Sequence, residues 1–402
     1  MTLPKEFLDQ YVNKTVPFKF NGVDMSFDLS HALFSSFDID VGSRLLLKLV
    51  ARNVDRSMVG SIVDIGSGVG VLGIACAKAY AGASLRMRDR DALACGFSER
   101  NARRNKITAA TIDHALFLDG IEGERYDLAL CNVPAKAGTP VLDLFLRQLP
   151  GVLTTRGYGA IVVVEPIAEA ATASVVASGA EIVASEAGAG HTAMLFRRGR
   201  AADPQTFDSM WQALERVEQT LRAGRASYRL AGIWGLPEFD TPSFATELAL
   251  DLCENAMAGS HVRRVAVINP GIGRAACYIK ARAREAVIDL CGRDGLALAS
   301  SARNLARNGL PDDPAQLRVA FALDMPSASY DLVVEFPDLT PRVDTVDQTW
   351  AQAVRVLKSG AGYVVAMPSS AMDRFERKRP KGFVRLAERK KKGFACAAWR
   401  LG

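Results

Sequence analysis

A chain of 402 residues is too long for a single hydrophobic core, and a composition of 49% hydrophobic and 23% charged residues excludes a disordered protein and predicts two globular domains. No segment is long and uncharged enough to cross a bilayer, and the first residues lack the apolar run of a signal peptide. The net charge of +6 is mild, and seven cysteines without CxxC spacing favour reduced thiols over disulfides or a metal site. We therefore predict a cytoplasmic protein with no membrane partner and no bound metal.

The first informative element is SIVDIGSGVGVLGIACAK, residues 61–78, which predicts a buried strand, a tight turn and a helix. Three glycines of the turn, Gly66, Gly68 and Gly70, let the backbone bend and approach a ligand closely. Such a turn lies at the ligand end of a doubly wound sheet. Asp64 precedes the first glycine and suits a ligand with a cationic aminoacyl end.

The next expected strand, ASLRMRD, ends at Asp89, where a carboxylate accepts both ribose hydroxyls of a nucleoside in this architecture. The spacing of 21 residues from Gly68 also suits a dinucleotide, because Gly68, Gly70 and Gly73 spell GxGxxG, which is a weak signal by itself. Asp89 has an alternative role as the N-cap of the following helix, although Asp91 is the better candidate for that cap.

A later strand, RYDLALCNVPAKAG, ends in Asn132-Val133-Pro134, where the sheet would place a reacting group. The alternative is that Asn132 only satisfies the backbone of the turn. His114 and His191 show no partner in the sequence and are interpreted as structural, with a contact between His114 and an adenine ring as the alternative.

Together, VDIGSGVG, Asp89 and the Asn132 turn resemble a class I S-adenosylmethionine-dependent methyltransferase. The segment HALFSSFDIDVGSRLLLKL, residues 31–49, is similar to a segment of the bacterial ribosomal-RNA small methyltransferases, which modify the exocyclic amine of guanine. The resemblance covers residues 17–200 and implies S-adenosyl-L-methionine as cofactor, RNA as partner, and a cofactor lid that includes Ser35. The cofactor-binding set that it implies is Phe34, Asp40, Gly42, Ser43, Asp64, Gly66, Gly68, Gly70, Asp89 and Asn132.

Methyl transfer from a sulphonium is an in-line displacement, so the enzyme has to align the nucleophile. We predict Asn132 and Pro134 as the catalytic residues, because the Asn132 side-chain carbonyl and the next backbone carbonyl can hold the two N–H donors of an amine. The family's turn reads Asn-Pro-Pro-aromatic, whereas Ala135 stands here at the aromatic position, so a stacking contact worth roughly 1–3 kcal/mol per base is missing. The acceptor stays open between an RNA base and a small metabolite. Lys136 either meets an acidic group of the acceptor or lies in solvent.

The chain repeats itself at an offset of 203 residues. The glycine turn recurs as VAVINPGIGRAACYIK, ERNARRN recurs as ARNLARN, and GHTAMLFRR recurs as GFACAAWRL. This tandem duplication predicts an α/β fold of two doubly wound, Rossmann-like methyltransferase domains. The second copy has lost both acids, the first glycine and the asparagine turn, which become Val267, Gly292, Asn269 and Phe336. We therefore predict that the second domain is degenerate, with a role in packing or substrate binding.

These boundaries predict a catalytic domain over residues 1–200, a connector helix over residues 201–225 and a degenerate domain over residues 226–402. The connector is expected to be helical because apolar residues recur along it at helical spacing. Residues 374–392 are dense in Lys and Arg and either bind a phosphate backbone or form a solvated surface.

Three functions are compatible with these observations. The leading prediction is S-adenosylmethionine-dependent methyl transfer to an amine nitrogen of an RNA base, in rRNA processing, with methylation of a small metabolite as the alternative. The second is a nicotinamide-dependent dehydrogenase, and the third is a non-catalytic RNA-binding scaffold. The dehydrogenase lacks a recognisable hydride-side acid and leaves Asn132 unexplained, and a scaffold would not need one copy to keep every cofactor residue while the other loses them. The oligomeric state is left open.

Overall fold

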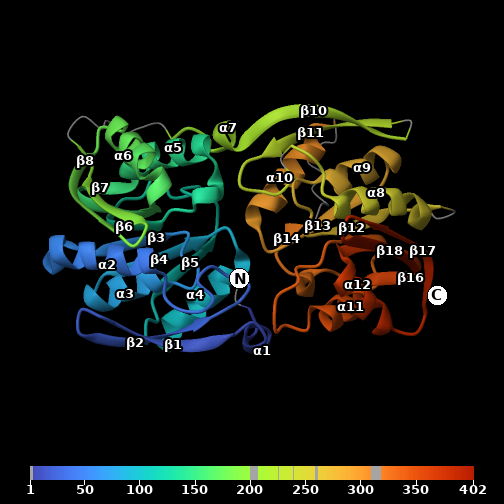
Figure 1. Cartoon of the computed structure of the whole chain (residues 1–402), viewed down its shortest axis with the longest axis horizontal. Helices are drawn as coiled ribbons and strands as arrows, with labels where there is room; N and C mark the ends of the chain where they lie inside the picture. Colours follow the sequence, from blue (N-terminus) through green and yellow to red (C-terminus); the bar gives the residue numbers. More distant parts are fainter. Residues whose placement is uncertain (1–2, 200–206, 225, 239, 259–260, 309–317) are drawn as a thin grey trace. The chain divides into compact units, whose positions relative to one another are not determined.

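The computed structural model describes residues 3–199, 207–224, 226–238, 240–258, 261–308 and 318–402. The chain divides into two compact units, Met1–Leu214 and Glu215–Gly402 (Figure 1). Each unit begins with a two-stranded hairpin and continues into a seven-stranded sheet covered by helices.

The first unit has the following strands: β1 (Lys14–Phe20), β2 (Val23–Leu29), β3 (Ser61–Ile65), β4 (Ser84–Asp89), β5 (Ala110–His114), β6 (Tyr126–Asn132), β7 (Leu153–Val164), β8 (Glu181–Gly188) and β9 (His191–Arg197). Its helices are α1 (Lys5–Asp9), α2 (Val41–Asn53), α3 (Val71–Ala79), α4 (Ala92–Arg104), α5 (Thr139–Gln148), α6 (Ala168–Ala177) and α7 (Trp211–Leu214). Helices α2, α3 and α4 cover one face of the sheet, and α5 and α6 pack together on the other (Figure 1). The central strand β3 is buried along almost its whole length because helices cover both faces of the sheet.

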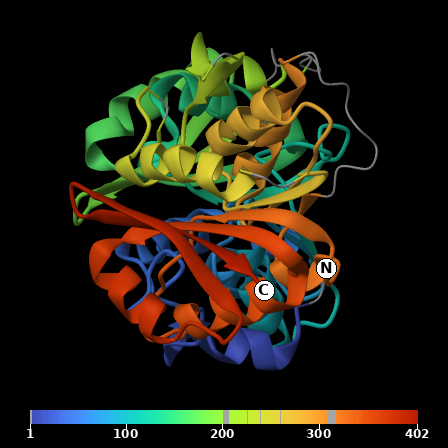
Figure 2. The same ribbon diagram turned by 90° about the vertical axis from the view of Figure 1, so that its right-hand side faces the viewer.

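The second unit has the following strands: β10 (Glu215–Ala223), β11 (Ala226–Ile233), β12 (Arg264–Ile268), β13 (Val287–Cys291), β14 (Arg318–Val319), β15 (Tyr330–Glu335), β16 (Leu357–Pro368), β17 (Phe383–Lys391) and β18 (Phe394–Leu401). Its helices are α8 (Phe244–Met257), α9 (Arg274–Arg282), α10 (Gly295–Ala306), α11 (Thr345–Val356) and α12 (Ser369–Arg377). The antiparallel strands β17 and β18 close one edge of the sheet, in red in Figure 2.

The two sheets have the same strand order. It is β5-β4-β3-β6-β7-β9-β8 in the first unit and β14-β13-β12-β15-β16-β18-β17 in the second. In both, the first five strands are parallel and the last two run antiparallel to their neighbours. This shared topology confirms the prediction of two tandem doubly wound domains.

Two asparagines of α4 fasten the hairpin of the first unit to its sheet. Asn101 donates from Nδ2 to the carbonyl of Asp28 at 3.0 Å, and its Oδ1 accepts the Asp28 N–H at 2.8 Å. Asn105 makes the same two bonds with Ser26, at 2.8 and 3.0 Å. Because each amide satisfies one donor and one acceptor of an edge strand, the hairpin loses the exposed backbone groups that would otherwise need water.

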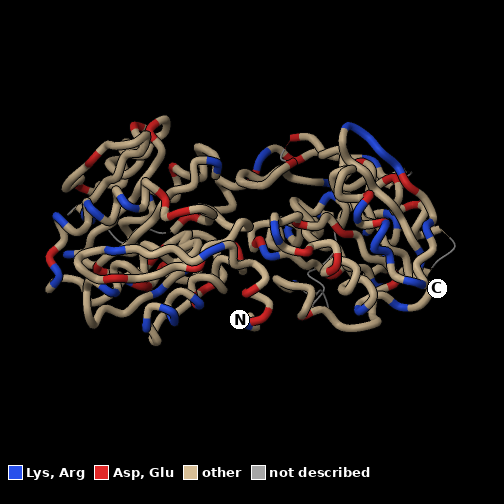
Figure 3. Tube along the Cα trace, turned by 60° about the horizontal axis from the view of Figure 1, so that its bottom comes forward, with Lys and Arg blue, Asp and Glu red and all other residues tan. Residues whose placement is uncertain are grey.

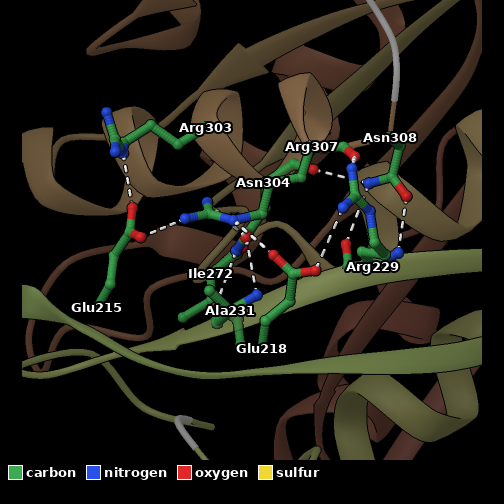
Figure 4. A network of polar contacts seen from close by, with 9 residues as sticks. All are labelled: Glu215, Glu218, Arg229, Ala231, Ile272, Arg303, Asn304, Arg307 and Asn308. Atoms are coloured by element: carbon green, nitrogen blue, oxygen red, sulfur yellow. Dashed lines mark hydrogen bonds and ion pairs between the residues drawn. The ribbon is translucent and has the colours of Figure 1, made fainter.

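The second unit repeats this arrangement on α10. Asn304 bonds the backbone of Ala231 at 3.0 and 2.9 Å, and Asn308 bonds the backbone of Arg229 at 3.0 and 2.7 Å (Figure 4). Asn304 also donates to the Ile272 carbonyl at 2.7 Å, next to the second glycine turn. The duplication therefore includes the hairpin as well as the sheet.

The expected connector helix over residues 201–225 is wrong in most of the part that the structure describes. Only Trp211–Leu214 is helical, and residues 215–223 form β10 of the second hairpin; residues 201–206 and 225 lie outside the described residues. Val217, which the helical spacing would bury, has an exposed fraction of 80%. Gly224, with φ at +58°, makes the turn into β11, and the strand pairing overrides the local helical spacing.

The second unit keeps a full aromatic core. The Trp350 ring stacks on Phe375 with 4.1 Å between ring centroids, and its Nε1 donates to the Phe375 carbonyl at 2.9 Å. Tyr363 and Trp399 pack edge-on against Trp350, at 5.7 and 5.3 Å. The loss of site residues in this copy has therefore left its packing intact.

All seven cysteines are buried free thiols. Within the described ranges, no helix has the length and apolar character needed to cross a membrane, and no group of His, Cys, Asp and Glu side chains is arranged to hold a metal ion.

Candidate functional site

The glycine turn joins β3 to α3 at the carboxyl end of the sheet. The N–H groups of Gly66 and Ser67 donate to the Arg88 carbonyl at 2.9 and 3.1 Å, which ties the turn to the end of β4. Gly66 and Gly68 have φ of +72° and +56°, and a Cβ built on either would meet nothing within 4 Å. Gly70, at φ +85°, caps α3. The turn is thus a bare backbone surface above α3, open to a ligand that approaches closely.

Asp89 lies at the end of β4 and is bonded to the glycine turn. Its Oδ2 accepts the N–H of Gly68 at 2.9 Å, and its Oδ1 accepts the N–H of Asp91 at 2.9 Å. The N-cap of α4 is Asp91, which accepts the N–H of Leu93 at 2.9 Å, so the assignment of the cap to Asp91 is confirmed. Asp89 is therefore positioned beside the turn and is not the cap of the helix.

Asp64 is a buried acid, 1% exposed, beneath the glycine turn. Its Oδ2 accepts the Gly73 N–H at 2.8 Å, while its buried Oδ1 has no hydrogen-bond partner in the part of the chain that the structure describes. Burial raises the pKa of Asp64 to about 7; the Gly73 hydrogen bond opposes this shift, and the charge of Asp89 adds to it. A Cβ at Gly73 would lie 3.0 Å from the Asp64 side chain, so this acid requires a glycine there.

The raised pKa of Asp64 predicts a pH-dependent stability. Between the ordinary Asp pKa of 3.8 and about 7, the folded protein keeps a proton that the unfolded chain releases, so the free energy of unfolding falls as pH rises through this window. The side chain of Asp64→Asn cannot titrate, so this variant escapes the loss. Its free energy of unfolding minus that of wild type should therefore be roughly 1–3 kcal/mol larger at pH 8 than at pH 5. Denaturant unfolding at both pH values measures the gain. Glu335, whose pKa is also about 7, is present in both proteins, so its effect on the pH dependence of stability cancels in the difference. A difference that does not change with pH would contradict the shift.

Asn132 is the last residue of β6, and its side chain joins a cluster with the start of α2. Its Nδ2 donates to Asp40 Oδ2 at 2.8 Å and to Ser43 Oγ at 3.1 Å. Asp40 is the N-cap of α2, and the same Oδ2 accepts the Ser43 N–H at 2.9 Å. Gly42 lies inside this turn, where a Cβ would be 3.0 Å from Asp40 Oδ2 and 2.8 Å from the His191 ring. The structure therefore brings together four residues of the predicted site: Asp40, Gly42, Ser43 and Asn132.

Phe34 and Pro134 complete the set of predicted residues. The Phe34 side chain is 69% exposed, and Pro134 caps a single 3-10 turn over Ala135–Ala137. His114 Nε2 lies 2.8 Å from the Arg90 carbonyl, and His191 Nδ1 lies 3.0 Å from the Ala189 carbonyl. Each histidine ring thus contacts a backbone carbonyl.

Two residues that support the glycine turn were not assigned a role from the sequence. Ser98 Oγ donates to the Gly68 carbonyl at 3.1 Å, and Asn101 Nδ2 donates to the Val69 carbonyl at 2.9 Å. The repeat of ERNARRN as ARNLARN was the signal that marked this helix. Position 101 falls inside that repeat, and its amide links the turn to the hairpin.

The second unit carries different groups at its turn. Asn269 takes the place of Gly66, with φ at +54° and an N–H that donates to the Cys291 carbonyl at 2.7 Å. Arg293 pairs with Asp338 at 2.8 Å across the ends of β13 and β15. A side chain and an ion pair thus lie where the first unit presents bare backbone and a carboxylate.

Strand pairing fixes the remaining correspondences between the units. Asp64 pairs with Leu130 in the first sheet, and Val267 pairs with Val334 in the second. Asn132 is two residues after Leu130, and Phe336 is two residues after Val334, so Phe336 takes the place of the asparagine. The second copy therefore lacks the buried acid and the amide at the equivalent positions.

Ion pairs neutralise much of the basic run at residues 374–392. Lys378 pairs with Asp344 and Asp347 at 3.0 and 2.8 Å, and Lys390 and Lys391 pair with acids of their own unit. Figure 3 shows basic and acidic residues interspersed over both units. Within the described part of the chain, five other cations of the run form no ion pair: Arg374, Arg377, Lys381, Arg389 and Lys392.

Comparison with known proteins agrees with this geometry. Residues 24–188 match the family model of the methyltransferase small domain. The chain is 34% identical to ribosomal RNA small subunit methyltransferase C of Haemophilus ducreyi over 103 residues. This stretch is 26% of this chain and 30% of that relative. It is 28% identical over 136 residues to the uncharacterized protein YbxB of Bacillus subtilis, covering 34% of this chain and 66% of YbxB. The matches thus span less than two thirds of these relatives.

Among solved structures, the chain is similar over 97% of its length to RsmC, a 16S rRNA methyltransferase of T. thermophilus solved with AdoMet and guanosine; 99% of that chain is covered, with a TM-score of 0.69 and 16% identity. At this identity the likeness concerns the fold, which is the tandem two-domain fold described above. The fold, the glycine turn and the family match define the class: the first unit is of the class I S-adenosylmethionine-dependent methyltransferase type. Within that class, the chain resembles the tandem-domain rRNA small subunit methyltransferases.

Proposed function

We propose that this chain transfers a methyl group from S-adenosyl-L-methionine to an amine nitrogen of an RNA base, and that the first unit carries out the reaction. The observation that carries the proposal is the Asn132 amide, which is held by Asp40 at the end of β6. Strands β3, β4 and β6 are neighbours in a parallel sheet, so their carboxyl ends form one edge at the topological switch point. The amide and the glycine turn are therefore placed on the same side of the sheet.

The residues of the turn fit S-adenosylmethionine. The open backbone of Gly66 and Gly68 would receive the ligand closely, and the Asp89 carboxylate would accept the ribose hydroxyls. The unpaired Oδ1 of Asp64 would accept a hydrogen bond from the cationic amine of the aminoacyl end. When bound, this cofactor supplies an electrophilic methyl group on a sulphonium.

The residues of the chain would align the nucleophile. The Asn132 side-chain carbonyl and the backbone carbonyl of Val133 would accept the two N–H groups of an amine, which turns the nitrogen lone pair toward the methyl group. No strong base is needed, since the methylated nitrogen is positively charged and loses its proton afterwards. Pro134 would hold the backbone of this turn through its fixed φ of −73°.

The choice of acceptor rests on two opposing features. The named rRNA methyltransferases among the relatives favour RNA. Ala135, which leaves the turn without a stacking ring, favours a small metabolite as the second candidate. Incubation with labelled S-adenosylmethionine, offered in parallel to unmodified ribosomal RNA and to a small-metabolite extract, tests the proposal. Label in the RNA supports it, and label only in the metabolite fraction would contradict it.

The basic run provides a further prediction about RNA. If the cations without an ion pair contact phosphates, replacing three of them, Arg374, Arg377 and Lys381, with Gln should lower the slope of log affinity against log salt by about 2, because fewer counterions are released. Lys378→Gln is the matched control, since its ammonium group is already paired with two carboxylates. Filter binding of ribosomal RNA at several salt concentrations measures the slopes. Equal slopes for the triple variant and the wild type would remove this run from the RNA-binding surface.

A further inference from the structure

The Asp40 side chain accepts more hydrogen bonds than the N-cap of a helix requires. Its Oδ2 accepts three donors: the Ser43 N–H at 2.9 Å, the Ser43 Oγ–H at 3.4 Å and the Asn132 Nδ2 at 2.8 Å. The last of these joins residues that are 92 positions apart in the chain. The start of α2 is in this way bonded directly to the end of β6.

The chemistry of a carboxylate decides how the Asn132 amide is oriented. An amide group has nearly the same shape when its oxygen and nitrogen are exchanged, so packing alone does not select one orientation. An ionised carboxylate only accepts hydrogen bonds, so it selects the orientation with NH2 toward Asp40. Ser43 Oγ both donates and accepts, and it would tolerate either orientation. Asp40 therefore directs Asn132 Oδ1 away from itself.

The second copy provides an internal comparison. Ser243 stands in the place of Asp40, caps α8, and accepts the Thr246 N–H at 3.1 Å. Serine and aspartate are about equally good N-caps, so the cap alone does not require a carboxylate. In that copy Phe336 replaces the asparagine, and no amide needs to be oriented. At the cap position itself, aspartate is present in the copy that has the amide and serine in the copy that lacks it, where Glu238 instead accepts the Ser243 N–H at 3.0 Å and the Thr246 hydroxyl at 2.6 Å.

We propose that Asp40 is a positioning residue, which orients the Asn132 amide so that Oδ1 faces the acceptor amine. This inference rests on the proposed function, and it replaces the cofactor-holding role that the resemblance implied for Asp40. The acceptor nitrogen would meet a carbonyl oxygen in this orientation and a repelling NH2 group in the other. Asp40 thus acts on alignment of the nucleophile and leaves cofactor binding unchanged.

Two substitutions at residue 40 separate the cap from the orientation. Asp40→Ser reproduces the cap of the second copy, but its side chain is too short to bond Asn132. For this variant kcat should fall about tenfold or more, while the KM for ribosomal RNA and the Kd for S-adenosylmethionine stay within about twofold of wild type. Asp40→Asn can still present one oxygen to the Ser43 N–H and to Asn132 Nδ2, so its kcat should stay within about threefold of wild type. Ser243→Ala, which removes the corresponding cap in the second unit, should leave kcat unchanged.

Equal losses of kcat in Asp40→Ser and Asp40→Asn would overturn the inference, because they would point to the charge instead of the amide orientation. A loss of cofactor affinity parallel to that of kcat would return Asp40 to the cofactor site and also overturn it. A second readout does not depend on turnover: the side-chain NH2 signals of Asn132, in protein labelled at asparagine, should shift in Asp40→Ser and stay near wild type in Asp40→Asn. If the wild type transfers no methyl group, the proposed function fails, while these NMR signals still decide whether Asp40 orients the amide.

Discussion

Asn132→Ala is expected to lower kcat by about 100-fold, because the acceptor amine loses the side-chain carbonyl that aligns it, and misplacement of a nucleophile by about 1 Å costs a factor of that order. Cofactor affinity should stay close to wild type, since the amide bonds Asp40 and Ser43 and lies on a different strand from Asp64 and Asp89. Single-turnover methyl transfer together with calorimetric titration of S-adenosylmethionine measures both quantities.

The matched control for Asn132 lies in the second unit. Phe336 occupies the equivalent position there, and Phe336→Ala should leave kcat unchanged even if it lowers the melting temperature. An Asn132→Ala protein that keeps more than about a third of the wild-type kcat would show that the amide does not align the acceptor.

Asp89→Ala should weaken S-adenosylmethionine binding by about 10- to 100-fold, which corresponds to the loss of charge-assisted hydrogen bonds of roughly 1.5–3 kcal/mol. The same change also removes the bond that Oδ2 makes to the Gly68 N–H, so the glycine turn loses its fastening to β4. Calorimetry is the measurement, and wild type should bind one cofactor per chain because Gly292 and Val267 replace the two acids in the second copy.

Asp91→Ala is the control for Asp89, two residues away. Asp91 accepts the Leu93 N–H as the N-cap of α4, so its loss should cost about 1 kcal/mol of stability with little change in cofactor affinity. Equal losses of affinity in the two variants would mean that the helix terminus, and not the Asp89 carboxylate, supports binding. Two equivalent cofactor sites per chain would contradict the degenerate second domain.

The fold could be predicted from the sequence because its signals are local and occur twice. A buried strand followed by alternating glycines indicates a doubly wound sheet in either copy, and the offset of 203 residues extends the assignment to the whole chain. The connector helix failed because the apolar spacing of residues 207–214 continues by chance into β10. The hairpin of β10 and β11 is bonded by Asn304 and Asn308, which lie more than 70 residues further along the chain. No local sequence pattern therefore predicts it.

The places of the candidate site residues in the fold could be predicted, but the connections between them could not. Asp89 and Asn132 are the last residues of their strands and Asp64 is the last but one of its strand, so each can be located from the strand and turn signals around it. The bond between Asp40 and Asn132 closes a loop of 92 residues, and its formation depends on how α2 packs against the sheet. The resemblance implies a cofactor-binding role for Asp40, and its bond to Asn132 is a contact that the sequence does not reveal.

The asparagine side chains that bond the backbone of each hairpin, here called the asparagine clasps, bear on whether the two hairpins of the duplicated chain could be exchanged. The clasps bond only backbone groups, so by themselves they would accept the hairpin of either copy on the helix of either copy. The neighbouring arginines discriminate. Arg100 and Arg104 pair with Asp28 on β2, whereas their equivalents on α10 pair with acids on the other strand, β10: Arg303 and Arg307 with Glu215, and Arg307 with Glu218 (Figure 4). In an exchanged pairing these arginines would have to turn toward an acid on the other strand of the hairpin, so the different positions of the acids favour each hairpin on its own helix.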